Sequence, residues 1–220
     1  MTLLNTTAYL SLLIQFITGV IDVWGLTLPT TVQIYKDLLK IELFVQVIEF
    51  IFYIWLVKHM KTKSNITPYR YFDWFLTTPS MLITLMAFLE PKNKYSSVLD
   101  FLQRNAATVA IVLILNWSML TIGLLGELKY LDERKSALIG FIPFILYFGL
   151  IYYKFITSSS TKGQKQVYFY FLFFWSLYGV AAMLPYQQKN AMYNILDLFA
   201  KNFFGLFLVY LIYTNPTQQK

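Results

Sequence analysis

Hydrophobic and polar positions follow one another along this chain in long blocks. Seven apolar segments, each of about 18–25 residues, are separated by short polar stretches. A helix of that length spans the roughly 30 Å hydrocarbon core of a bilayer. The segments are Ala8–Leu28, Gln33–Val57, Pro68–Leu89, Ala106–Leu125, Ala137–Ile156, Val167–Leu184 and Met192–Tyr213. This pattern predicts an all-α membrane protein.

The connections between the segments are short and hold most of the charges and helix breakers, as in "HMKTKSNITP" and "KYLDERKS". Short connections force neighbouring helices to pack antiparallel in one bundle. We therefore expect residues 1–220 to form a single seven-transmembrane helix bundle.

Composition supports a bilayer as the chain's surroundings. The residues are 57% hydrophobic and only 13% charged, whereas a soluble domain is about 25% charged. With no cysteine and one histidine, His59, a thiolate or multi-histidine metal centre is excluded. The net charge of +7 includes no basic run dense enough to suggest nucleic acid as a partner. Lysines and arginines divide almost evenly between the two sets of loops, so charge alone leaves the orientation open.

Six ionisable residues lie inside the apolar segments, where charge is costly and marks a functional pathway by default. Structural ion pairing within the bundle is the alternative. Members of each pair are spaced three, four or seven residues apart, so each pair shares one helix face. The pairs are Arg70 with Asp73, Asp197 with Lys201, and Glu42 with Glu49. Together they predict a polar column through an apolar shell.

Lys201 has a second use, because a buried amine can condense with a carbonyl to form a Schiff base. Once protonated, that Schiff base is a buried cation. Two neighbouring carboxylates would then stabilise it.

Four stretches resemble helices of the microbial (type 1) rhodopsins. The stretch "RYFDWFLTTPSML" resembles their third helix, and "NWSMLTIGLLGEL", "FFWSLYG" and "LDLFAKNFFG" resemble their fourth, sixth and seventh. The order is that of the family, and the seven segments cover nearly the whole chain. The resemblance implies a multi-pass membrane protein with a retinal pocket, its amino terminus outside and its carboxy terminus in the cytoplasm.

The resemblance also implies site residues. Lys201 would bind all-trans retinal as a Schiff base, Asp73 and Asp197 would be its counterions, and Arg70 would lie on their outer side. The positions that would line the pocket are Trp74, Thr77, Thr78, Met81, Met119, Gly123, Trp175 and Tyr178. Gly179 and Ala182 replace the proline and tryptophan of many members, so the ring end of the pocket should be shaped differently.

Thr84 occupies the position at which outward proton pumps carry an acid that reprotonates the Schiff base. A hydroxyl has no proton to give near neutral pH. Glu42 and Glu49 instead resemble the glutamate series of channelrhodopsins, where a glutamate and an asparagine after the lysine, here Asn202, form a gate. We expect Glu49 to lie level with the Schiff base and to hydrogen-bond with Asn202 and the Schiff-base region in the dark.

Further polar residues would extend this path. Asn194 lies one turn before Asp197, and either Ser11 or Thr18 of the first segment would complete the gate.

These features predict a light-gated cation channel, opened by retinal isomerisation and Schiff-base deprotonation. The alternatives are an outward proton pump with Glu42 as substitute donor, and a photosensor that signals through a separate protein. No enzymatic activity is expected. The short loops and the stretch "TTAYLSLLIQFITG" resemble the rhodopsins of large algal DNA viruses, so the membrane would be that of a host cell or virion. The expected partners are the lipid bilayer, monovalent cations and protons, while homo-oligomers stay open.

Overall fold

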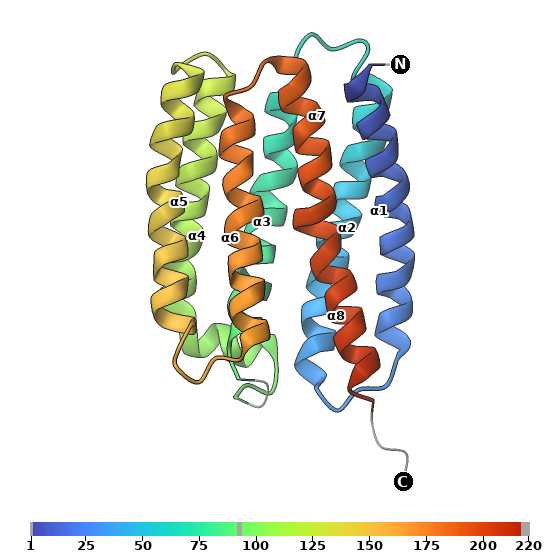
Figure 1. Cartoon of the computed structure of the whole chain (residues 1–220), viewed down its shortest axis with the longest axis vertical. Helices are drawn as coiled ribbons and strands as arrows, with labels where there is room; N and C mark the ends of the chain where they lie inside the picture. Colours follow the sequence, from blue (N-terminus) through green and yellow to red (C-terminus); the bar gives the residue numbers. More distant parts are fainter. Residues whose placement is uncertain (1, 92–93, 217–220) are drawn as a thin grey trace.

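The computed structural model describes residues 2–91 and 94–216, and within these ranges the chain folds as a bundle of helices (Figure 1). The helices are α1 (Leu3–Thr27), α2 (Gln33–His59), α3 (Thr67–Leu89), α4 (Val98–Glu127), α5 (Glu133–Phe155), α6 (Lys162–Ala182), α7 (Tyr186–Asp197), the π-helical segment η1 (Leu198–Asn202) and α8 (Phe203–Thr214). Because α7, η1 and α8 follow one another directly, they form the seventh rod of a seven-helix bundle. The predicted fold class is confirmed.

The rods run alternately up and down, and the last rod returns to pack against α1 and α2 (Figure 1). The chain begins at one end of the bundle and its described part finishes at the other, and we call these the N-terminal end and the C-terminal end. Capping side chains fix several helix starts. Ser97, Asp132 and Thr161 each accept a hydrogen bond from a backbone amide of the first turn.

The observed helices differ from the predicted apolar segments mainly where polar residues at a helix end are also helical. The last rod begins at Tyr186, six residues before the predicted Met192, because the polar turn "YQQKN" is also helical. The helix α4 begins at Val98 and bends at Asn105, whose φ of −116° and ψ of 16° are not helical. Hydropathy marks apolar length, whereas helices continue until a cap stops them.

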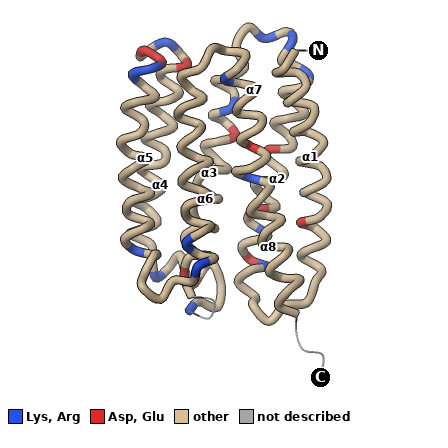
Figure 2. Tube along the Cα trace, viewed as in Figure 1, with Lys and Arg blue, Asp and Glu red and all other residues tan. Residues whose placement is uncertain are grey.

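The outer surface of the bundle is apolar and charged groups lie inside it, which is the arrangement of an integral membrane protein that crosses the bilayer several times. Five helices, with α7 to α8 counted as one, are long and apolar enough to cross a membrane. The remaining two are less apolar. The helix α2 carries several charged side chains, and α6 begins with the polar stretch "KGQKQ" and contains three tyrosines. Figure 2 shows acidic positions well inside the bundle as well as at its ends.

The segment η1 widens the last rod by one residue in the region of Lys201. Three consecutive side chains of this segment, Ala200, Lys201 and Asn202, are all buried. Single π-helical turns of this kind occur frequently at functional sites.

A buried ion pair joins α7 to α4 near the N-terminal end. Lys189 Nζ lies 2.7 Å from Glu127 Oε1, and both side chains are about 95% buried. Glu133, at the start of α5, is a second and more distant partner at 3.6 Å. The pair therefore fixes the start of the seventh rod to the α4–α5 hairpin.

Replacing one partner of this pair should destabilise the fold. Lys189→Met leaves the Glu127 carboxylate buried without its cation, which costs about 3 kcal/mol or more. The double variant Glu127→Leu/Lys189→Met should recover most of the loss, because no buried charge is left over. Thermal melting of the purified protein in detergent measures both. A single variant that melts with the wild-type protein would contradict the account.

Candidate functional site

The centre of the bundle holds one amine among three carboxylates. Lys201 Nζ lies 2.5 Å from Asp73 Oδ2 and 3.3 Å from Glu49 Oε1. A third carboxylate oxygen, Asp197 Oδ1, lies 3.8 Å away. All four side chains are at least 96% buried. An ammonium without partners would not be stable at this depth, so the carboxylates are what allow a lysine here.

Arg70 lies on the side of this cluster that faces the N-terminal end. Its guanidinium donates to the side-chain oxygens of Asn190 at 3.0 Å and Asn194 at 2.5 Å, and it pairs with Asp197 at 3.5 Å. The side chain is fully buried. The planar guanidinium of arginine suits several acceptors held in fixed directions. All three acceptors belong to α7, and one of them is the predicted counterion Asp197.

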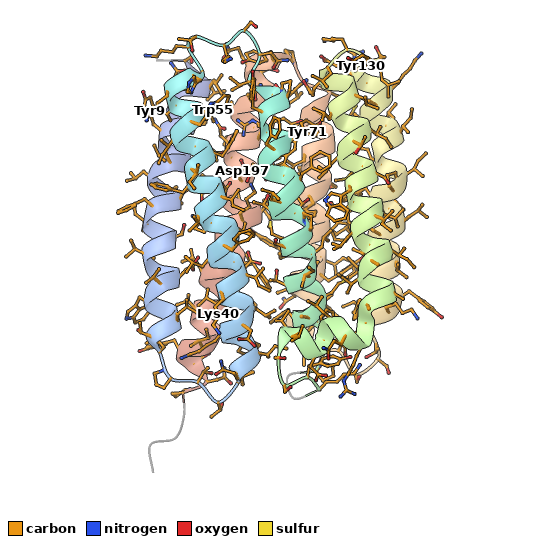
Figure 3. The ribbon with its side chains drawn as sticks, turned by 180° about the vertical axis from the view of Figure 1, so that it is seen from behind. Tyr9, Lys40, Trp55, Tyr71, Tyr130 and Asp197 are labelled. Atoms are coloured by element: carbon orange, nitrogen blue, oxygen red, sulfur yellow. The ribbon has the colours of Figure 1, made fainter. Side chains whose placement is uncertain are left out.

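Two tyrosines hold Asp197 in place. Tyr53 of α2 donates to Oδ2 and Tyr178 of α6 donates to Oδ1, both at 2.7 Å. Figure 3 places Asp197 in the interior of the bundle, while Tyr9 and Tyr130 lie at its outer edges. With hydroxyls on both oxygens, Asp197 is oriented by its surroundings, whereas Asp73 Oδ1 has no hydrogen-bond partner and is the freer of the two predicted counterions.

Polar side chains continue from the amine toward the C-terminal end along α1 and α2. Thr18 donates to Asn202 Oδ1 at 2.5 Å. Gln46 donates to Thr18 at 3.0 Å and to the backbone oxygen of Gln15 at 2.7 Å. These four residues form a hydrogen-bonded network, which we call the Thr18–Asn202 network, on the C-terminal side of Lys201.

The two first-helix residues predicted as candidates for the gate have different partners. Thr18 reaches Asn202, whereas Ser11 donates to the backbone oxygen of Asn194 at 2.8 Å and lies nearer the N-terminal end. The predicted hydrogen bonding between Glu49 and Asn202 is wrong, since neither carboxylate oxygen of Glu49 has a hydrogen-bond partner. Glu49 is drawn to the ammonium of Lys201 instead, and Asn202, the next residue along η1, faces α1.

Glu42 lies deeper toward the C-terminal end and accepts a hydrogen bond from the Thr84 hydroxyl of α3. It is 98% buried. Thr84 therefore positions an acid that another helix supplies. At position 84, α3 has a threonine and no acid, but the Glu42 carboxyl group of α2 lies beside it.

A cavity of about 110 Å³ opens beside Lys201 and runs between α3, α4, α5 and α6. Its lining includes eight of the sequence-predicted residues, namely Trp74, Thr78, Met81, Met119, Gly123, Trp175, Tyr178 and Lys201. Thr77 is not part of the lining. Its hydroxyl donates to the Asp73 backbone oxygen at 2.9 Å, so it acts on the turn that carries the counterion.

Small residues of α6 and aromatic rings of α5 also line the cavity. Gly179 and Ala182 of α6 lie there together with Phe141. A Cβ atom at position 179 would come within 2.5 Å of the Phe141 ring, so the ring occupies the space that a larger residue would need. The predicted difference from other family members at Gly179 and Ala182 stays a prediction.

Comparison with known proteins gives one family and several similar folds. The family model described as bacteriorhodopsin-like protein matches residues 2–215. Among solved structures, the viral rhodopsin OLPVRII has a TM-score of 0.83 and 25% identity, covering 98% of this chain and 100% of that chain. No curated protein sequence matches the chain.

Two further solved structures share the fold at lower identity. A blue light-absorbing proteorhodopsin from Med12 has a TM-score of 0.75 and 19% identity, covering 96% of each chain. The light-driven proton pump Coccomyxa subellipsoidea rhodopsin has a TM-score of 0.74 and 17% identity, covering 94% of this chain and 96% of that chain. At these identities the likeness concerns the fold alone.

The cavity and its amine fit retinal, the cofactor that proteins of this family bind through a Schiff base to a lysine. Lys201 lies in the seventh rod at the polar end of the cavity. Most of the other lining side chains are aromatic or aliphatic, including two tryptophans, which suits a rigid apolar polyene.

Sequence reasoning missed several residues of the site, although a signal for them was present. Ser11, Gln15, Thr18 and Asp22 recur at intervals of four, three and four residues, which places them on one face of α1. The same intervals relate Glu42, Gln46, Glu49 and Tyr53 in α2. All eight are more than 90% buried. A search for this repeat would have found Gln15, Gln46, Tyr53 and Asp22.

Neutralising Asp73 should change the colour of the retinal-bound protein. A carboxylate 2.5 Å from the nitrogen stabilises the ground state, in which the positive charge sits on that nitrogen. Asp73→Asn should therefore shift the absorption maximum to longer wavelength, and by more than Asp197→Asn, whose carboxylate is at 3.8 Å. Dark absorption spectra measure this, with the exposed Asp132→Asn as control. An unshifted Asp73→Asn spectrum would contradict the assignment.

Proposed function

The chain belongs to the bacteriorhodopsin-like family, and from that premise we propose that it is a light-gated cation channel. The proposal depends on one observation above the others, the third carboxylate beside the amine. Glu49 adds a negative group from α2 next to Lys201, at 3.3 Å. It lies in the polar stripe that α1 and α2 share, so it connects the retinal site to the ion path described below.

Retinal, when bound to Lys201, supplies light absorption and an isomerisation that changes the position and proton affinity of the Schiff-base nitrogen. The protein's own groups do the rest. Asp73 Oδ2, at 2.5 Å from that nitrogen, is placed to accept its proton. Once Asp73 has taken the proton, the charge balance at Glu49 and Asp197 changes as well, because all three carboxylates share one cation.

The ion path proposed here uses oxygens from three rods. A cation must exchange its hydration water for oxygen ligands along the way. Toward the N-terminal end these are the side chains of Asn190, Asn194 and Asp197, with Arg70 among them. Beyond Glu49 the path meets Gln46, Thr18 and Asn202. The excess of carboxylates favours cations over anions along this route.

The Thr18–Asn202 network is the closed gate in this proposal. Its hydrogen bonds join α1, α2 and η1 directly, so a hydrated ion would have to break them to pass. Asn202 is bonded to Thr18 and is covalently next to Lys201, so a displacement of Lys201 acts on the gate through one peptide bond. The gate is thus a two-state element that a local charge change can bias. We place the N-terminal end of the bundle outside the cell, as the resemblance implied.

An outward proton pump is the second candidate, and one observation favours it. Glu42 is bonded to Thr84 on the C-terminal side of the Schiff-base position, so a proton donor from α2 is available where α3 has none. The sequence offers a photosensor as a third reading, with no observation in the bundle that favours it over the other two.

Voltage clamp of cells expressing the retinal-bound protein separates these functions. A channel gives a photocurrent that reverses sign near the equilibrium potential of the permeant cation. A pump's current stays outward across the accessible voltages, and a sensor gives almost none. A photocurrent that never reverses would contradict the channel proposal.

Glu49→Gln tests the observation on which the proposal depends. Loss of about 1.4 kcal/mol of attraction at one binding position changes cation occupancy roughly tenfold. The variant should therefore conduct roughly tenfold less and should shift its reversal potential when sodium is replaced by potassium on one side. Asp132→Asn, an exposed acid in the α4–α5 connection, should leave both unchanged. Wild-type conductance and selectivity in Glu49→Gln would exclude Glu49 from the path.

A further inference from the structure

Asp22 is a buried acid of α1 that the proposed path and gate do not use. It is 99% buried, and its Oδ1 atom has no hydrogen-bond partner. Within the described part of the chain, no ion pair includes it. A carboxyl group in such a place costs stability, so its presence needs a physical reason.

The register of α1 against α2 places Asp22 level with Glu42. The two helices are antiparallel, and Gln46 contacts Gln15, Thr18 and Gly19 of α1. Further along, Leu39 lies against Gly25. The step of seven residues from Gln46 to Leu39 in α2 therefore corresponds to the step of seven residues from Thr18 to Gly25 in α1. Asp22 and Glu42 lie between these two contact levels, on the buried faces of their helices.

Each of these two acids presents an oxygen without a partner. Glu42 uses Oε1 to accept from Thr84, while its Oε2 has no hydrogen-bond partner. Asp22 points toward α8, where a Cβ atom at Gly205 would lie 2.7 Å from Asp22 Oδ2. The absence of a side chain at position 205 thus provides the space that the Asp22 carboxyl occupies. The two carboxyl groups thus lie among α1, α2, α3 and α8, and the described residues include no cation paired with either of them.

Two carboxyl groups at one buried level cannot both be ionised without a cation, because each unpaired charge would cost several kcal/mol. Because the described residues place no cation beside either acid, each of the two carboxyl groups keeps its proton in the dark. On its C-terminal side, Leu39 and Val209 close against Gly25, so an apolar layer separates the pair from that end of the bundle. On its other side begins the Thr18–Asn202 network, which leads to Lys201. A proton held here is shielded from bulk water and faces the Schiff-base position.

We propose that Asp22 and Glu42 form a proton-storing pair that returns a proton to the Schiff-base nitrogen of Lys201 after illumination. The proton leaves the Glu42 carboxyl group and forms the N–H bond at the nitrogen, through water that enters when the Thr18–Asn202 network opens. Asp22 then gives its proton to the Glu42 carboxylate. It is refilled later from the C-terminal end, by water that crosses the apolar layer of Leu39 and Val209. This rests on the proposed function only in that light removes the Schiff-base proton. It applies equally to passive conduction and to pumping.

Flash absorption spectroscopy of Asp22→Asn tests the pair. Loss of a positioned proton donor slows proton transfer by about a hundredfold or more, so recovery of the protonated Schiff base should slow by at least about tenfold. Glu42→Gln should do the same, and the double variant should be little slower than either single one, because both act in one path. Asp37→Asn, an acid of α2 paired with Lys40 nearer the C-terminal end, is the matched control and should recover at the wild-type rate.

Vibrational spectroscopy gives a readout that a merely structural role would not move. In protein labelled with carbon-13 aspartate, a carboxylic acid stretch should appear in the infrared spectrum of the dark state and change on illumination. Asp22→Asn should remove that band. If the band persists and recovery is unchanged, the pair proposal is overturned.

Gly205→Ala keeps both acids but pushes a methyl group against the Asp22 carboxyl, so it should shift the band and slow recovery. Unchanged band and rate in this variant would also count against the proposal. The outcomes are separable from the proposed function. A photocurrent without reversal would reject the channel and leave the pair standing, whereas wild-type recovery in Asp22→Asn would reject the pair and leave the channel standing.

Discussion

The attraction between the Lys201 amine and its three carboxylates is the interaction on which the rest of this structure depends. An ammonium in the middle of a membrane bundle is stable only with compensating charge, and here that charge comes from α2, α3 and the seventh rod. The same arrangement determines what surrounds it. Asp197 needs the hydroxyls of Tyr53 and Tyr178, and Arg70 needs Asn190 and Asn194.

The helices of the bundle have apolar outer faces and polar inner faces. Aliphatic and aromatic side chains cover the outside, where Leu13, Phe16 and Val20 of α1 are all more than half exposed. The opposite face of α1 carries a buried polar stripe that matches the stripe of α2 across an antiparallel contact. Polar groups buried in pairs across two helices satisfy each other and fix the register of those helices. The same stripes that stabilise the interior also hold the part of the proposed cation path, and the proposed proton store, on the C-terminal side of Lys201.

Much of this could be predicted from the sequence, and the failures have physical causes. Apolar blocks of membrane-spanning length predicted the bundle, and the motif around Arg70, Asp73 and Lys201 predicted the retinal site. Gln15, Gln46 and Tyr53 were missed because uncharged polar residues do not interrupt an apolar block, although their spacing was readable. The bonding of Asn202 to Thr18 depends on the π-helical turn and on the register of α1, neither of which hydropathy encodes. Asp22 was missed because a single acid near a helix end resembles an interfacial residue.

The most direct test of the account concerns the covalent linkage at the centre of the site. Borohydride reduces a carbon–nitrogen double bond to a stable single bond, so reduction of the retinal-bound protein followed by peptide mass mapping identifies the attached lysine. The account predicts one retinyl group per chain, on the peptide that contains Lys201, and none on Lys189, the buried lysine three turns earlier in the same rod. A coloured protein whose label maps to another lysine, or to none, would contradict the account.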